Sequence, residues 1–279
     1  MATAVDVLVP TFNRPASLAI TLTSLASQSF HEFCVIVSDQ TEEFSVDERP
    51  EVRGVLRILE AKGVPAYLRR NRPRRGMAEQ RQFLLEQAMA PYVLYLDDDL
   101  VLERDVVARL QAAMIAERCG FVGSAPIGLS HINDVRLHEQ AIEFWDGPVL
   151  PEEVTWEGTR WQRHRLHNAA NIFHVAQRLR LTPECQRLYK VAWVGGCVLF
   201  DRRALLSVGG FSFWRELPEA HCGEDVLAQL RVMRHYGGCA VLPSGTYHLE
   251  LPTTLPDRRI NAPELLPVDV PLKTTMIAQ

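Results

Sequence analysis

The sequence predicts an α/β protein whose twisted, mainly parallel central sheet carries helices on both faces. In the first half of the chain, short apolar runs alternate with segments that have a helical pattern, and this alternation is typical of parallel sheets. The apolar runs have the length of strands and are Val5–Val9, Cys34–Ser38, Ala66–Arg69, Tyr92–Leu96 and Phe121–Ser124. Helices are expected from Pro15, within residues 46–62, from Gly76 to Ala88 and over residues 103–118.

The pattern changes after about residue 128, and residues 130–190 show few clean periods but are rich in tryptophan, histidine and arginine. Order returns with the apolar run Val191–Phe200, a predicted helix over Val226–Met233 and a predicted strand at Cys239–Leu242. Prolines are dense after residue 250, which argues against a packed helix or sheet there. We therefore expect one domain over residues 1–250, with halves 1–125 and 126–250, and a proline-rich tail over residues 251–279.

Composition excludes several classes of protein. The chain has 279 residues, of which 47% are hydrophobic and 23% are charged, as in ordinary globular domains. Its formal net charge of −4 argues against a nucleic-acid partner, and no apolar run is long enough to cross a bilayer. The start of the chain lacks the pattern of a signal peptide, and the six cysteines form no CxxC pair. We expect buried, reduced cysteines and a cytoplasmic protein.

The sharpest chemical feature is the triplet Asp97-Asp98-Asp99, which directly follows a predicted strand. Three adjacent carboxylates repel one another unless solvent or a cation relieves them. In an extended segment Asp97 and Asp99 would point the same way, and oxygen ligands suit Mg²⁺ or Mn²⁺. The alternative is a solvated acidic turn before the next helix. The triplet alone does not separate the two interpretations.

Two segments after the first and second strands are candidates for nucleotide binding. The loop Pro10–Arg14 would face the aspartates if strands one and four are neighbours, and the Arg14 guanidinium could then hold a nucleotide. Asp39 ends the second strand, where a carboxylate can accept hydrogen bonds from a ribose or a base. Taken singly, each segment is more typical of an ordinary turn.

A basic run and two later motifs complete the candidates. Five arginines between residues 69 and 75 precede Gly76 and suit a diphosphate, although a solvated basic loop is equally compatible. Glu224 and Asp225 open a helix, where acidic residues complement the helix dipole or, alternatively, supply a general base. His248 follows a strand, and a lone histidine is more often structural than a ligand. The chain has no P-loop and no GxGxxG motif.

Taken together and in this order, these segments resemble the family 2 glycosyltransferases, which have a GT-A fold. The similarity covers about residues 4–250, whereas residues 130–190 match no acceptor motif of the family. The segments that carry it are LVPTFNR (8–14), IVSDQT (36–41), Gly76 with Ala78 and Arg81, YLDDDL (95–100), WVGGCVLFDRRALLSVGGF (193–211), GEDVLAQLR (223–231) and His248.

The resemblance implies an inverting transfer of a sugar from a nucleotide-sugar donor to a carbohydrate or another hydroxyl-bearing acceptor. It implies that the first half binds the donor through Pro10, Thr11, Arg14, Asp39, Gly76, Arg81, Asp97 and Asp98. Asp99, with Asp97 and His248, would hold Mn²⁺ or Mg²⁺. Asp225 would be the general base, with Glu224 beside it. The acceptor side would contain Trp193, Gly195, Gly196 and Trp214, and we extend it to the tryptophans of residues 130–190, such as Trp161.

Two other classes of protein remain compatible with these motifs. A nucleotidyltransferase also pairs carboxylates with a metal on an α/β sheet, but it would need a phosphate-grasping signature near the start, and Pro10–Arg14 is a poor one. A non-catalytic nucleotide-sugar-binding protein could share the fold. The presence of both Asp99 and Asp225 argues against that class.

Overall fold

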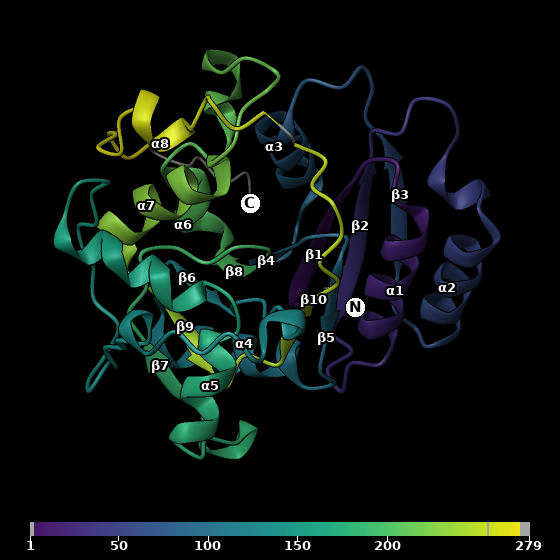
Figure 1. Ribbon diagram of the computed structural model, residues 1–279. Coiled ribbons are helices and arrows are strands. Elements are labelled where there is room, and N and C mark those ends of the chain that lie inside the picture. The colour runs from purple at the N-terminus through teal and green to yellow at the C-terminus, as the bar shows by residue number, and fades with distance from the viewer. Residues whose placement is uncertain (1–2, 256, 274–279) are drawn as a thin grey trace.

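A computed structural model describes residues 3–255 and 257–273 of the chain. Its centre is an eight-stranded sheet of order β3-β2-β1-β4-β8-β6-β9-β7 (Figure 1). The strands are β1 Val5–Thr11, β2 Phe33–Asp39, β3 Ala66–Arg70, β4 Tyr92–Leu96, β6 Phe121–Gly123, β7 Arg187–Tyr189, β8 Cys197–Asp201 and β9 Gly238–Leu242. A second sheet pairs β5 Leu100–Leu102 with β10 Thr246–His248.

The first half of the chain has the expected alternation of strands and helices. Strands β3, β2, β1 and β4 pair in parallel in this order. Strand β1 is therefore the neighbour of β4, and the loop Pro10–Arg14 can face the aspartates after β4, as expected. Every residue of β1 and β2 is buried, which explains why these runs read as continuously apolar. The helices of this half are α1 Pro15–Ala26, η1 Val46–Glu48, α2 Pro50–Ala61, α3 Met77–Gln87 and α4 Val106–Glu117.

In the second half the sheet is mixed. Strand β8 pairs antiparallel with both β4 and β6, while β9 is parallel to β6. Strand β8 begins only at Cys197, near the end of the apolar run Val191–Phe200, because Gly196 has φ 66° and turns the chain. The helices are η2 Leu129–His131, η3 Leu137–Glu139, η4 Thr159–His167, α5 Asn171–Arg178, η5 Pro183–Cys185, α6 Arg202–Ser207, η6 Ser212–Glu216, α7 Glu224–Tyr236 and α8 Ala262–Leu265.

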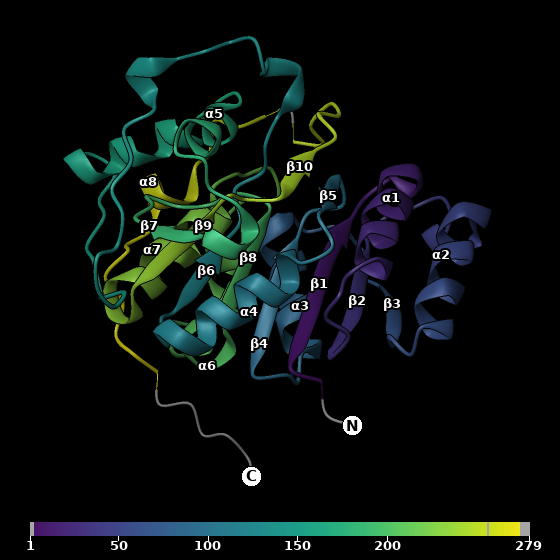
Figure 2. The same ribbon diagram turned by 90° about the horizontal axis from the view of Figure 1, so that it is seen from below.

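Apolar side chains fill a layer on each face of the sheet. Helices α1, α2 and α4 pack on one face, and α3, α6 and α7 pack on the other. Residues 128–185 form an outer layer over the second half (Figure 2). Their short helices bury Trp161, Leu166 and Ile172 in the same core as α7, so this irregular stretch is part of the domain. None of the described helices is long and apolar enough to cross a membrane.

The segment after residue 250 differs from the expectation. Prolines suggested that it would not pack, but the short helix α8 contacts α7, and Ala262 is fully buried. Val268 and Val270 also pack against the core on the α7 face. Pro263 stands in the first turn of α8, where its missing N–H costs no hydrogen bond. The last residues of the predicted tail, 274–279, lie outside the described residues.

Candidate active site

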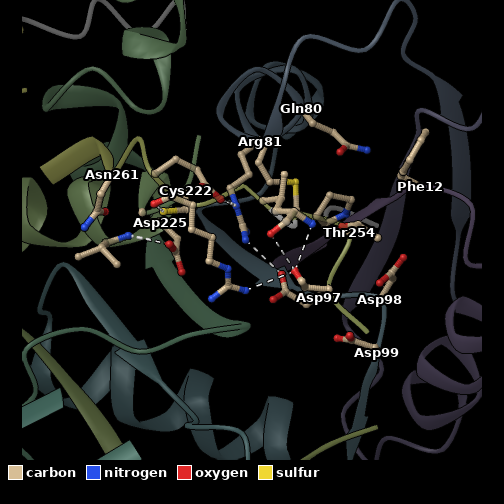
Figure 3. A pocket seen from close by; sticks show the side chains of 18 of the residues that line it. Phe12, Gln80, Arg81, Asp97, Asp98, Asp99, Cys222, Asp225, Thr254 and Asn261 are labelled. Atoms are coloured by element: carbon tan, nitrogen blue, oxygen red, sulfur yellow. Dashed lines mark hydrogen bonds and ion pairs between the residues drawn. The ribbon is translucent and has the colours of Figure 1, made fainter. Parts of the chain in front are cut away.

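A cavity of about 560 Å³ opens at the carboxyl ends of β1 and β4, and residues of both halves line it. Ligands of open α/β sheets bind at this edge. The structure brings most of the predicted site residues together here. Those that line the cavity are Pro10, Thr11, Arg14, Arg81, Asp97, Asp98, Asp99, Trp193, Glu224, Asp225 and His248. Figure 3 shows Asp225 on the opposite side of the cavity from Asp98 and Asp99.

The three aspartates occupy the tight turn between β4 and β5. The turn corrects the expectation that an extended segment aligns Asp97 with Asp99: here Asp98 and Asp99 share the Arg14 guanidinium. Arg14 Nη1 donates to Asp99 Oδ2 at 2.7 Å and to Asp98 Oδ1 at 3.4 Å. Thr11 Oγ1 donates to Asp98 Oδ2 at 2.6 Å. The loop after β1 therefore holds two of the three carboxylates in place.

In the turn Asp97–Asp99, called the acid turn below, burial and mutual repulsion disfavour the ionised carboxylates. Burial raises the pKa of Asp98 to about 7, and the neighbouring Asp99 adds to that shift. Burial and the charge of Asp97 likewise raise the pKa of Asp99. Such shifts mark carboxylates whose ionised form lacks sufficient positive charge around it. A bound cation would supply that charge.

Arg81 connects the acid turn to helix α7. Its buried side chain donates from Nη2 to Asp97 Oδ1 at 3.1 Å and from Nε to Glu224 Oε1 at 3.0 Å. Burial opposes the charge on the guanidinium, but the surrounding carboxylates outweigh that effect and raise the pKa of Arg81. The Tyr95 hydroxyl donates to the carbonyl of Arg81 at 2.8 Å and fixes this turn of α3. Arg81 of α3 thus links Glu224 of α7 to Asp97 of the acid turn in one network of ion pairs.

Asp225 faces the cavity in the first turn of α7. Burial and the adjacent Glu224 raise the pKa of Asp225 to about 7. The Glu224 side chain is buried and forms an ion pair with Arg81. A carboxyl group with a pKa near neutrality is well matched to proton transfer.

His248 lies near the acid turn but is held in an unfavourable tautomer for a metal ligand. Pairing of β10 with β5 places its Nε2 3.7 Å from Asp99 Oδ2. Its Nδ1 accepts the backbone N–H of Glu250 at 2.7 Å. A backbone N–H can only donate, so the proton of neutral His248 sits on Nε2, the nitrogen that faces Asp99. Across residues 3–255 and 257–273, no three His, Cys, Asp or Glu side chains form a ready-made metal site.

Comparison with known proteins identifies the family. Residues 6–184 match the model of glycosyl transferase family 2. The chain belongs to this family. The matched range includes the Arg14 loop and the acid turn but ends before Glu224, Asp225 and His248. No curated protein matches the chain.

Solved structures show that this family 2 member has the GT-A glycosyltransferase fold. TarS residues 1–349 of S. aureus, in complex with UDP-GlcNAc, superposes with a TM-score of 0.54 at 16% identity over 91% of this chain and 60% of that one. The mannosyltransferase PcManGT of Pyrobaculum calidifontis, in complex with GDP-Man and Mn²⁺, gives 0.51 at 17% identity over 86% and 57%. The chain therefore spans about 60% of the length of these neighbours.

Asp39 does not line the cavity, contrary to the expectation of an accessible strand-end carboxylate. Its side chain is fully buried. Its two oxygens accept the backbone N–H groups of Thr41 and Val46 at 2.8 and 3.0 Å, and Arg70 forms an ion pair with it. Asp39 thus organises the loop after β2, because all its bonds go to that loop and to β3.

The predicted glycines also act behind the cavity wall. Gly76 has φ 93°, and a Cβ there would lie 2.6 Å from the carbonyl of Glu219 and from His221. A Cβ on Gly196 would lie 3.2 Å from Asp97 Oδ2, and its carbonyl accepts the Asp97 N–H at 2.8 Å. Gly195 has only Trp193 near its Cβ position. Only Gly196 therefore lies against a charged group, Asp97, and none of the three glycines lines the cavity.

Trp214 also lies outside the cavity. Its ring packs beside the guanidinium groups of Arg75 and Arg215, at centroid distances of 6.0 and 4.7 Å.

Of the five arginines between residues 69 and 75, only Arg74 lines the cavity, where its guanidinium lies over the ring of Phe12 at 4.2 Å. Arg70 forms an ion pair with Asp39, and Arg72 donates to the carbonyl of Glu42.

Several cavity residues were not predicted from the sequence. Gln80 joins the ends of β1 and β2 by donating to the carbonyls of Thr11 and Ser38. His164 lies within the irregular stretch that carried no motif. Arg258 belongs to the proline-rich segment that was expected not to pack. Trp156 and Trp161, by contrast, are among the tryptophans of residues 130–190 that were expected on the acceptor side, and both line the cavity.

Proposed function

We propose that the protein transfers a sugar, with inversion, from a nucleoside-diphosphate donor to a hydroxyl group of an acceptor. One observation carries the proposal: the acid turn at the end of β4 faces Asp225 across a single cavity, and Arg81 bonds to both walls. This arrangement supports a leaving group on one side and a proton acceptor on the other. The complexes of TarS with UDP-GlcNAc and of PcManGT with GDP-Man support a nucleotide sugar as donor.

The residues of the acid turn fit a divalent cation, Mn²⁺ or Mg²⁺. Asp97 and Asp99 offer hard oxygen donors, and Asp97 keeps a third of its side chain exposed to the cavity. Such an ion stabilises negative charge on a departing diphosphate. His248 would join as a ligand only after its Nδ1 released the Glu250 N–H. Arg14 now binds Asp99 and would have to yield part of that contact.

Asp225 is our candidate for the general base. In its ionised form it would accept the proton of the acceptor hydroxyl as the new glycosidic bond forms. Glu224 and Arg81 position this turn of α7 and stay bonded to each other. We propose that the loop after β1, Arg81 and the acid turn bind the donor.

The acceptor side comprises the aromatic wall that Trp156, Trp161 and Trp193 form across the cavity. The rings of Trp156 and Trp161 lie 4.6 Å apart, and Trp156 is 42% exposed. Exposed aromatic rings pack against the apolar faces of sugars, so a carbohydrate acceptor fits this wall. In this proposal residues 1–250 form one domain, with a donor half (1–125) and an acceptor half (126–250), and Leu251–Leu255 and Arg258–Pro263 add to its site. The cysteines, all free within the described residues, fit a reducing, cytoplasmic location.

The test is a panel of UDP-, GDP- and dTDP-sugars, assayed for release of the nucleoside diphosphate with simple sugar acceptors. We expect release with at least one donor in the presence of Mn²⁺ or Mg²⁺, and loss of release in excess chelator. Release of pyrophosphate from nucleoside triphosphates would instead indicate a nucleotidyltransferase. Binding of a nucleotide sugar without turnover of any acceptor would indicate a binding protein. Full activity in excess chelator would contradict the metal site.

A further inference from the structure

Leu251–Leu255 and Arg258–Pro263 supply one wall of the cavity. After β10 the chain runs across the front of the molecule to α8, as the yellow segment of Figure 1 shows. Thr254 and Asn261 from this segment appear among the cavity side chains in Figure 3. The segment is anchored at its far end: Cys222 N donates to the carbonyl of Ile260, and Ala262 N donates to the carbonyl of Cys222, both at 2.9 Å. Its residues therefore hold a defined place beside the start of α7.

Four of the described arginines line the cavity, and they differ in whether a carboxylate already pairs with the guanidinium. Arg14 and Arg81 form ion pairs with the acid turn and with Glu224. Arg74 lies over the ring of Phe12, and Arg258 donates only to Thr253 Oγ1, at 3.3 Å. Within residues 3–255 and 257–273, neither Arg74 nor Arg258 has a carboxylate partner. Arg74 and Arg258 are thus the guanidinium groups of the cavity whose charge is still available.

We propose that Arg258 binds the diphosphate of the donor, together with Arg74 from the loop before α3. The inference rests on the proposed function and adds a second positive contact to it. A nucleoside diphosphate brings negative charge into a cavity whose acid turn repels it, and guanidinium groups bind phosphate oxygens with two parallel hydrogen bonds. The neighbouring Arg259 is bonded to Asp257 at 2.6 Å and does not line the cavity. Of the adjacent Arg258 and Arg259, only Arg258 is therefore placed to bind the ligand.

The experiment compares Arg258→Ala with the matched control Arg259→Ala. Calorimetry measures the affinity for UDP, GDP and dTDP, and saturation-transfer NMR measures the weaker affinity for uridine, guanosine and thymidine. We expect Arg258→Ala to weaken binding of the preferred diphosphate by about tenfold, the loss of one charge-assisted contact of about 1.4 kcal/mol. Its affinity for the nucleoside should stay unchanged, because a nucleoside has no phosphate. Arg259→Ala should bind both ligands as the wild type does.

Three results would overturn the inference while leaving the proposed function intact. They are an unchanged diphosphate affinity in Arg258→Ala, an equal loss for the nucleoside and the diphosphate, and a change confined to the Michaelis constant of the acceptor. A wild-type protein that binds none of the diphosphates would overturn the proposed function and this inference with it. Thermal unfolding of both variants shows whether the segment still packs.

Discussion

At the scale of single residues, Asp225 and Asp39 lie at comparable places in the sequence pattern but in different surroundings. Each stands at the end of an element where a functional carboxylate is common. Asp225 opens onto the cavity beside Glu224, whereas Asp39 is fully buried and bonded to backbone and to Arg70. The sequence shows the residue type and its place in the element. It does not show which way the side chain points, and that direction decides the role.

Replacing Asp225 by asparagine should lower kcat by about 10²–10⁴-fold, because the amide keeps the shape of the side chain but accepts no proton. Donor affinity should change little. The wild-type activity should also fall as the pH drops below about 7, since the pKa of Asp225 is raised to about 7 and its protonated form cannot act as a base. Steady-state kinetics over pH 5–9 test both points. Normal turnover by Asp225→Asn would reassign the base.

Asp39→Ala should destabilise the fold rather than act on donor binding alone. The change leaves two backbone N–H groups and part of the Arg70 charge without a partner, and breaking a buried pair costs about 3 kcal/mol. Urea unfolding of the variant measures the loss. Glu48→Ala in the same loop is the control, because Glu48 is exposed. A variant as stable as the wild type but with weak donor binding would restore the nucleotide role.

At the scale of elements, the first half of the fold was predictable because each element there obeys a local rule. Buried parallel strands are continuously apolar, and α1 begins at Pro15 as expected. The second half was harder, because β7 is short and residues 128–185 pack through scattered side chains rather than a periodic face. The site followed the same division. The acid turn and α7 carry motifs, whereas Arg258 and Trp156 reach the cavity only through tertiary packing.

Trp156→Ala should raise the Michaelis constant of the acceptor severalfold and leave that of the donor unchanged. The 42% exposure of Trp156 makes it a safer probe than Trp161, which is buried and whose loss would disturb the fold. Trp214→Ala is the control, since Trp214 lies outside the cavity. Kinetics with both substrates varied distinguish the two sites. Equal effects on both Michaelis constants would show that Trp156 supports the cavity as a whole.

At the scale of the whole molecule, two apolar layers stabilise one sheet, and the cavity lies where its two halves meet. A donor that contacts both halves should therefore stabilise the entire fold. At one hundred times its dissociation constant, a ligand raises the free energy of unfolding by about 2.7 kcal/mol. A thermal-shift panel of nucleotide sugars, with and without Mn²⁺, should show the gain for the true donor. Glucose, which lacks the nucleotide, is the control and should leave the midpoint unchanged.

The Arg14 side chain has a consequence for the order in which ligands bind. It joins the acid turn to the Pro252 carbonyl of the segment that crosses the cavity. An incoming cation must compete with this internal positive charge, whereas a nucleoside diphosphate would offer the displaced guanidinium a new partner. Cation and nucleotide should consequently favour each other's binding, and the factor must be the same in both directions. Arg14 would then act as an internal competitor that weakens the binding of a metal ion when no nucleotide is present.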